Sequence, residues 1–90
     1  MKHAGDAALD SIDELLVKIR AAGADLKEKK RGTFYRKSSA LLHFHEDPAG
    51  MFADLKLGSE FQRFRVSTGR EQAAFLRELA RALGDTRRGA

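Results

Sequence analysis

The chain has 90 residues, no cysteine, and a formal net charge of +4, with a sequence pI near 9.8. This length fits one domain with a small core, and the lack of cysteine excludes disulfides and thiolate zinc sites. No apolar run approaches the roughly 20 residues of a membrane helix, and the first residues lack the apolar region of a signal peptide. We therefore expect one cytoplasmic domain, residues 1–90, without a membrane partner. Its basic character permits a polyanionic partner without requiring one.

The first periodic segment predicts a helix over about residues 6–22. Leu9, Ile12, Leu16 and Ile19 recur at the spacing of one helical face. Acidic residues crowd its first turns, and Gly23 is a natural stop after its last turn. The following residues, 24–32, have no apolar period and predict a charged, basic connection.

Residues 33–67 predict an antiparallel sheet. Apolar and polar residues alternate in "MFADLKL" and "FRVST", and a further run, "ALLHFHE", precedes them. The first turn centres on Pro48 and Ala49, and the second on Gly58 and Ser59. We expect a three-stranded meander, with a short extra strand over 33–36 as the alternative.

The last periodic segment predicts a helix over residues 69–84. Thr68 and Glu71 form a capping box, and Gly84 marks the expected end. Residues 85–90 are expected to be a frayed tail. The fold class is therefore α+β, a two-layer α-β-β-β-α domain in which helices flank the meander.

The two turns fix a register, and the register determines which side chains share a face. One face becomes almost entirely apolar, through residues that include Leu42, Phe44, Ala53, Leu55 and Phe64. The opposite face carries three cross-strand rows: His43–Asp54–Arg63, His45–Phe52–Arg65 and Leu41–Lys56–Phe61. Directly opposed side chains lie about 5 Å apart at Cβ, so each row is a set of neighbours.

A metal site is one interpretation of "LLHFHED". His43 and His45 share a face, and Asp54 is the obvious third ligand. Zinc takes at least three protein ligands, however, and Arg63 competes for the Asp54 carboxylate. His3 lies on an expected loose end. The sequence therefore favours a surface charge ladder and no cofactor, with His43, His45 and Asp54 as the candidate ligands if a metal binds.

Catalysis is disfavoured. Ser39, His43 and Asp54 can be written as a triad, but no nucleophile elbow or oxyanion donors accompany them. The segment "GADLKEKK" lacks the second glycine of a phosphate-binding loop. We expect a non-catalytic module with no small-molecule substrate.

Nucleic acid is the expected partner if the polar face of the sheet is open. Aromatic side chains that stack on bases, interleaved with cations that meet phosphates, form a single-strand binding platform. The candidates combine this face with the basic segment 27–37: Lys27, Lys29, Lys30, Arg31, Tyr35, Arg36, Lys37, His45, Phe52, Lys56, Phe61, Arg63 and Arg65.

Two alternatives remain open for the same face. Leu41, Phe52 and Phe61 together are an apolar patch, which is typical of a protein-protein or homodimer interface. A helix, or residues 24–37, folded over this face would instead bury the patch within a monomer.

The segment "KKRGTFYRKSSALLHFHEDPAGMFADLKLGSEFQRFRVST" resembles short bacterial proteins of unknown function. A fainter similarity, carried by "RGTFYRKSSALLHF" and "ADLKL", runs to the MmcQ/YjbR-like proteins, which have been likened to DNA-binding folds. The first resemblance covers a little under half the chain and implies a small α+β domain with no assigned activity. Neither resemblance transfers a functional residue.

Overall fold

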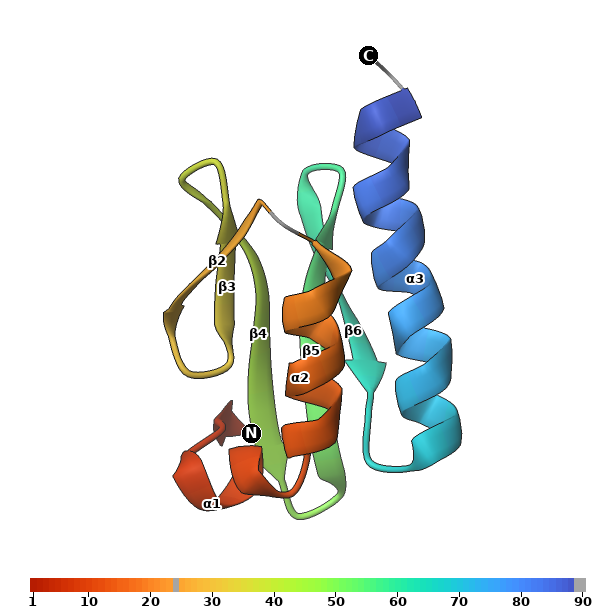
Figure 1. Ribbon diagram of the computed structural model, residues 1–90. Helices are drawn as coiled ribbons and strands as arrows, with labels where there is room; N and C mark the ends of the chain where they lie inside the picture. The colour runs from red at the N-terminus through yellow and green to blue at the C-terminus, as the bar shows by residue number, and fades with distance from the viewer. Residues whose placement is uncertain (24, 89–90) are drawn as a thin grey trace.

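The computed structural model describes residues 1–23 and 25–88, which form one antiparallel sheet and a layer of helices (Figure 1). The fold class is α+β with a meander, as the sequence predicts. The elements in chain order are β1 Lys2–His3, α1 Asp6–Asp10, α2 Asp13–Ala22, β2 Leu26–Lys30, β3 Thr33–Arg36, β4 Ser39–Asp47, β5 Gly50–Leu57, β6 Glu60–Arg65 and α3 Gly69–Arg88.

The strands from β2 to β6 follow one another across the sheet in chain order. Two-residue turns join the last three, because Asp47 pairs with Gly50 and Leu57 pairs with Glu60. Gly50 and Gly58 both have positive φ, at 137° and 67°, which suits glycine at tight hairpins. The predicted centres of both turns are therefore confirmed.

A third tight turn joins β3 to β4. Arg36 pairs with Ser39, and the two residues between them, Lys37 and Ser38, have φ values of 51° and 71°. Positive φ at both central residues is the type I′ pattern, which continues the twist of the flanking strands. The strand over residues 33–36, predicted only as an alternative, is therefore present as β3.

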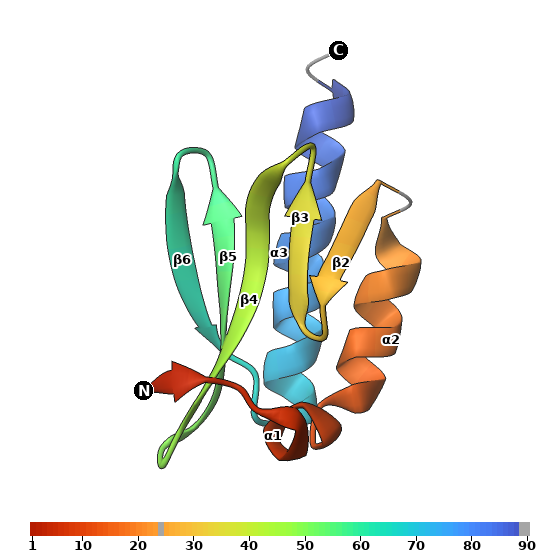
Figure 2. The ribbon, with the colours of Figure 1, turned by 90° about the vertical axis from the view of Figure 1, so that its left-hand side faces the viewer.

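All three helices lie on one face of the sheet. Phe75 of α3 packs edge-on against Phe44 of β4 and Phe64 of β6, with ring centroids 6.4 Å and 5.7 Å apart. Leu16 of α2 and Leu9 of α1 are buried in the same cluster. Figure 2 shows the strands in front of α3, with α2 to one side, next to β2. In the part of the chain that the structure describes, no helix covers the opposite face, which we call the open face.

The first helix differs from its prediction. The helical run predicted over 6–22 is interrupted at Ser11 and Ile12, and α1 and α2 are separate helices. The φ of Ile12 is −120°, outside the helical region, and its side chain is 3 % exposed. The break lets Ile12 and Leu9 enter the core while α1 and α2 run in different directions (Figure 1).

The basic connection predicted over 24–32 is wrong for most of its length, because Leu26–Lys30 is strand β2. Half-buried and exposed residues alternate along the first half of β2, but the half-buried position after Leu26 is the charged Glu28. The Glu28 carboxylate accepts two hydrogen bonds from Arg20 of α2 and one from the Gly32 amide. Lysine-rich edge strands are common because their charge prevents pairing with other chains. Apolar periodicity therefore could not reveal this strand.

The predicted end of the last helix at Gly84 is also wrong, since α3 continues to Arg88. Of the predicted tail 85–90, residues 85–88 are helical, and 89–90 lie outside the described residues. The predicted capping box is confirmed: the Glu71 amide donates to Thr68 Oγ1 at 3.1 Å, and the Thr68 amide donates to Glu71 Oε1 at 3.0 Å. Across the described ranges, no helix combines the length and the apolar character needed to cross a membrane.

Candidate functional site

The open face contains the cross-strand rows that the turns predict. His43 pairs with Asp54 and Asp54 with Arg63, while His45 pairs with Phe52 and Phe52 with Arg65. Lys56 pairs with Phe61 in the third row. These side chains therefore share the face opposite the helices.

Leu41 does not belong to the exposed part of that face. It lies at a register shift between β3 and β4, where Phe34 pairs with Leu42 but Tyr35 pairs with Ala40. Its side chain is only 8 % exposed and packs with the core. The predicted exposed patch is reduced to Phe61, which is 45 % exposed, and the half-buried Phe52.

Strands β2 and β3 extend the open face beyond β4. Lys27 pairs with Tyr35, so the two share a face, while the neighbouring Phe34 is buried on the helical side. The Lys29 ammonium lies 4.5 Å from the centroid of the Tyr35 ring, a cation–π contact on the same face. An aromatic ring with two lysines thus continues the surface of Phe52 and Phe61.

Among the residues whose burial the structure describes, Asp54 is the one buried charged or polar residue, at 7 % exposure. Arg63 donates from Nε and Nη2 to its two carboxylate oxygens, each at 2.8 Å. The Arg63 guanidinium holds the pKa of Asp54 below its usual value, and burial opposes that change. Asp54 is therefore an ionised carboxylate beneath a half-exposed arginine.

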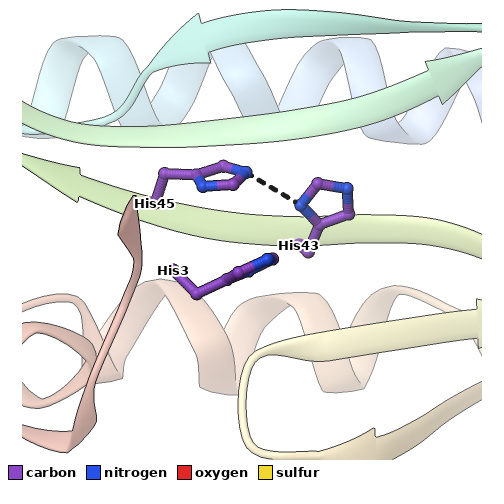
Figure 3. Close-up of side chains that lie close together, drawn as sticks. All are labelled: His3, His43 and His45. Carbon is purple, nitrogen blue, oxygen red and sulfur yellow. Dashed lines mark hydrogen bonds between the residues drawn. The ribbon is translucent and has the colours of Figure 1, made fainter. Parts of the chain in front are cut away.

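Three histidines gather beside this carboxylate (Figure 3). His43 and His45 are two residues apart on β4, and His3 of β1 is the register partner of His45. Their ring centroids are 5.0 Å apart for His43 and His45, 4.7 Å for His3 and His45, and 5.8 Å for His3 and His43. The structure thus brings in one residue, His3, that the sequence places on a loose end.

The hydrogen bonds of this cluster centre on His45. Its Nε2 lies 3.1 Å from His43 Nδ1 and 3.1 Å from Asp54 Oδ2. Burial lowers the pKa of His43, and the nearby Asp54 carboxylate partly offsets that effect. Neutral imidazoles leave one ring nitrogen free to accept a hydrogen bond or to bind a metal.

Several predicted binding residues are engaged elsewhere. Arg31 contacts Asp6, Asp10 and Asp13 of the first two helices at 2.7–3.5 Å, on the helical side. Arg36 forms an ion pair with Asp25 at 2.9 Å.

Arg65 also has its own partners. Its guanidinium donates to the Ala49 carbonyl oxygen and, at 2.9 Å, to Glu71 of α3. It therefore links β6 to the first turn of α3. Lys30 is exposed at the end of β2, and Lys37 is exposed in the β3–β4 turn, so both lie at the margin of the open face.

The residues that the structure does place together on the open face form two groups. The first is the aromatic and basic group, which we call the platform: Lys27, Lys29, Tyr35, Phe52, Lys56, Phe61 and Arg63. The second is the histidine cluster, His3, His43 and His45, which contacts the platform where His43 meets Phe61 at a centroid distance of 5.0 Å.

Comparison of the chain with models of protein families, with curated proteins and with solved structures finds no match.

Proposed function

We propose that the protein is a non-catalytic cytoplasmic binding module whose platform binds single-stranded nucleic acid. One observation carries the proposal: the helices cover one face of the sheet (Figure 2), and the residues of the other face include aromatic rings between cations. Bases stack on exposed rings, and lysines contact the phosphates that link neighbouring sugars.

The aromatic rings span the sheet from one side to the other. Tyr35 lies on β3, Phe52 on β5 and Phe61 on β6. Phe61 pairs with Lys56, four residues along β5 from Phe52, so a strand of nucleic acid that meets all three rings has to run obliquely across the sheet. Stacking tolerates any base, and the expected binding is therefore only weakly dependent on nucleotide sequence.

The cations of the platform can contact several phosphates of a nucleic-acid backbone. Lys27 and Lys29 are exposed beside Tyr35, and Lys56 Nζ donates to Ser39 Oγ at 3.3 Å beside Phe61. Arg63 keeps about half of its side chain exposed while it neutralises Asp54. Asp54 is covered by Arg63, so its charge is paired rather than presented to phosphate.

The test is titration of a fluorescent oligonucleotide of about 12 nucleotides at about 50 mM and 200 mM salt. We expect binding that weakens steeply with salt. Phe61→Ala should weaken it by about 1–3 kcal/mol through lost stacking. Val17→Ala is the matched control, because Val17 is 54 % exposed but lies on α2, in the helical layer.

A second pair of variants tests the contribution of lysine–phosphate contacts to binding. Lys29→Gln should reduce the salt dependence, whereas Lys18→Gln, which removes the same charge from an exposed position on α2, should not. Absence of binding at low salt would refute the proposal, as would equal effects of the platform and control variants.

A protein partner or a second copy of the chain is the alternative occupant. Strand β6 favours it, because among the described residues β6 pairs with β5 alone and so presents a free edge next to Phe61. Sedimentation at high concentration separates the two proposals. A monomer that binds the oligonucleotide excludes the dimer, and a salt-insensitive dimer that Phe61→Ala dissociates supports it.

A further inference from the structure

We propose that His3, His43 and His45 form a binding site for a divalent transition-metal ion, with Zn²⁺ as the best fit. This site is separate from the proposed binding of nucleic acid and needs no partner molecule. It also differs from the set His43, His45 and Asp54 that the sequence suggests, because the third imidazole comes from β1.

The first argument is the number and type of donors. Zinc is commonly bound by three histidines, with water in the fourth position. One ligand atom from each of the three imidazoles can be chosen so that all three lie within 4.8 Å of one another. Two adjacent histidines on one strand would provide only a bidentate surface site, and His3 completes the set.

The second argument is the distance between donor atoms. Zn–N bonds of about 2.0–2.1 Å in a tetrahedral site place the donor nitrogens about 3.3 Å apart. His43 Nδ1 and His45 Nε2 already lie 3.1 Å apart. A ring nitrogen of the exposed His3 lies within 4.8 Å of the other two, so the His3 side chain has to move towards them to complete a tetrahedral set.

The third argument is how the backbone holds the donors. His3 and His45 are paired across the β1–β4 ladder, and the Ala4 amide donates to the Phe44 carbonyl oxygen at 3.1 Å beside them. Glu46, the partner of Lys2 in the same ladder, accepts the Gly5 amide at 2.8 Å. The donors therefore sit on hydrogen-bonded strands, which limits the ordering that metal binding requires.

The charge next to the cluster is balanced, although the protein as a whole is basic. Asp54 Oδ2 lies 3.1 Å from His45 Nε2, between the cluster and Arg63. Its carboxylate offsets the guanidinium charge of Arg63, which lowers the repulsion that an ion bound by the imidazoles would meet. His3 is exposed, so an ion and its water can reach the site from solvent.

The test is isothermal titration of the full chain, prepared without a polyhistidine tag, with Zn²⁺ alone. We expect one ion per chain, chemical-shift changes confined to the rings of His3, His43 and His45, and no response to Mg²⁺, which prefers oxygen ligands. His3→Gln should weaken binding by more than about tenfold. The control Lys2→Gln changes the neighbouring exposed residue of the same strand and should leave the affinity unchanged.

His3→Gln lies at an exposed position and is expected to fold, so loss of binding in this variant reports on ligation. A fold of the variant that matches the parent by circular dichroism verifies this. Asp54→Asn should keep one-to-one binding at reduced affinity. Absence of Zn²⁺ binding, binding at several sites, or equal affinity of His3→Gln and Lys2→Gln would overturn the proposal.

Discussion

Asp54 connects the two groups of residues on the open face, because it contacts both Arg63 and His45. It is nearly buried on a face that is otherwise polar and solvated, and it contacts His45 and both donor atoms of Arg63. The sequence predicts its row neighbours because the hairpin register is determined by the turns. Its burial is less predictable, since it depends on how the side chains of Arg63 and His45 are placed against it.

Asp54→Ala should destabilise the protein by about 1–3 kcal/mol, because it removes a hydrogen-bonded carboxylate and leaves its partners without an acceptor. The loss is smaller than for a fully buried ion pair, since Arg63 is half exposed and water can replace the carboxylate. Chemical denaturation measures this change. Asp6→Ala, at a carboxylate 88 % exposed, is the control and should cost much less.

Gly50 and Gly58 offer a matched pair of turn substitutions. A Cβ at Gly50 would overlap the Ser67 hydroxyl, which accepts the Met51 amide, whereas at Gly58 no atom lies within 4 Å. Gly58→Ala should cost about 1 kcal/mol for its positive φ, and Gly50→Ala clearly more. Thermal unfolding of both variants tests this expectation, and equal losses would contradict the steric argument.

At the scale of elements, the hairpins were the predictable part. Pro48, Gly50 and Gly58 mark turns by local chemistry, and the alternating strands around them then align an apolar face. Strands β1 and β2 could not be predicted, because what holds them in the sheet is contact with residues distant in the sequence rather than a pattern of neighbouring residues. β1 has two residues, and the inward side of β2 includes Glu28, whose charge is stabilised by an arginine from another element.

The contact between α2 and β2 predicts an acid-sensitive stability. The Arg20 guanidinium holds the pKa of Glu28 below its ordinary value of 4.5, burial opposes this, and the Gly32 amide assists. A carboxyl with a lowered pKa stabilises the fold above its unfolded pKa, and the stabilisation is lost as the pH falls through the lowered value. Glu28 is only partly buried, so the effect is modest.

Glu28→Gln tests that contribution. The variant should be less stable than the parent at about pH 7, and the difference should shrink as the pH falls through the lowered pKa and the parent carboxyl takes up a proton. Thermal unfolding across this range gives the comparison. A difference that stays constant with pH would show that packing, rather than charge, accounts for the role of Glu28.

At the scale of the whole molecule, the decisive fact is that the helices share one face. The sequence gives each helix an apolar stripe and gives the sheet one apolar face. It also places Leu41, Phe52 and Phe61 on the other face, which left a second covering layer open as an alternative. The register shift at Leu41 resolves part of that ambiguity, because it takes this side chain into the core.

Strand β1 has a consequence for the order of folding. The hairpins from β2 to β6 close short loops, but Gly5 and Glu46, which bond beside β1, are 41 positions apart along the chain. Long loops close late because their entropy cost precedes any gain from contacts. We therefore expect β1 to dock after the hairpins and to detach first in the native state.

Amide hydrogen exchange can follow that detachment. The Ala4 amide, bonded to Phe44, should exchange through local opening and much faster than the amide of the fully buried Val66, bonded to Met51 just after β6. Similar rates would mean that β1 opens only with the whole domain. An ion bound by His3 would slow the detachment of β1 from β4. Slower exchange of the Ala4 amide in the presence of the ion would therefore measure how firmly β1 is held.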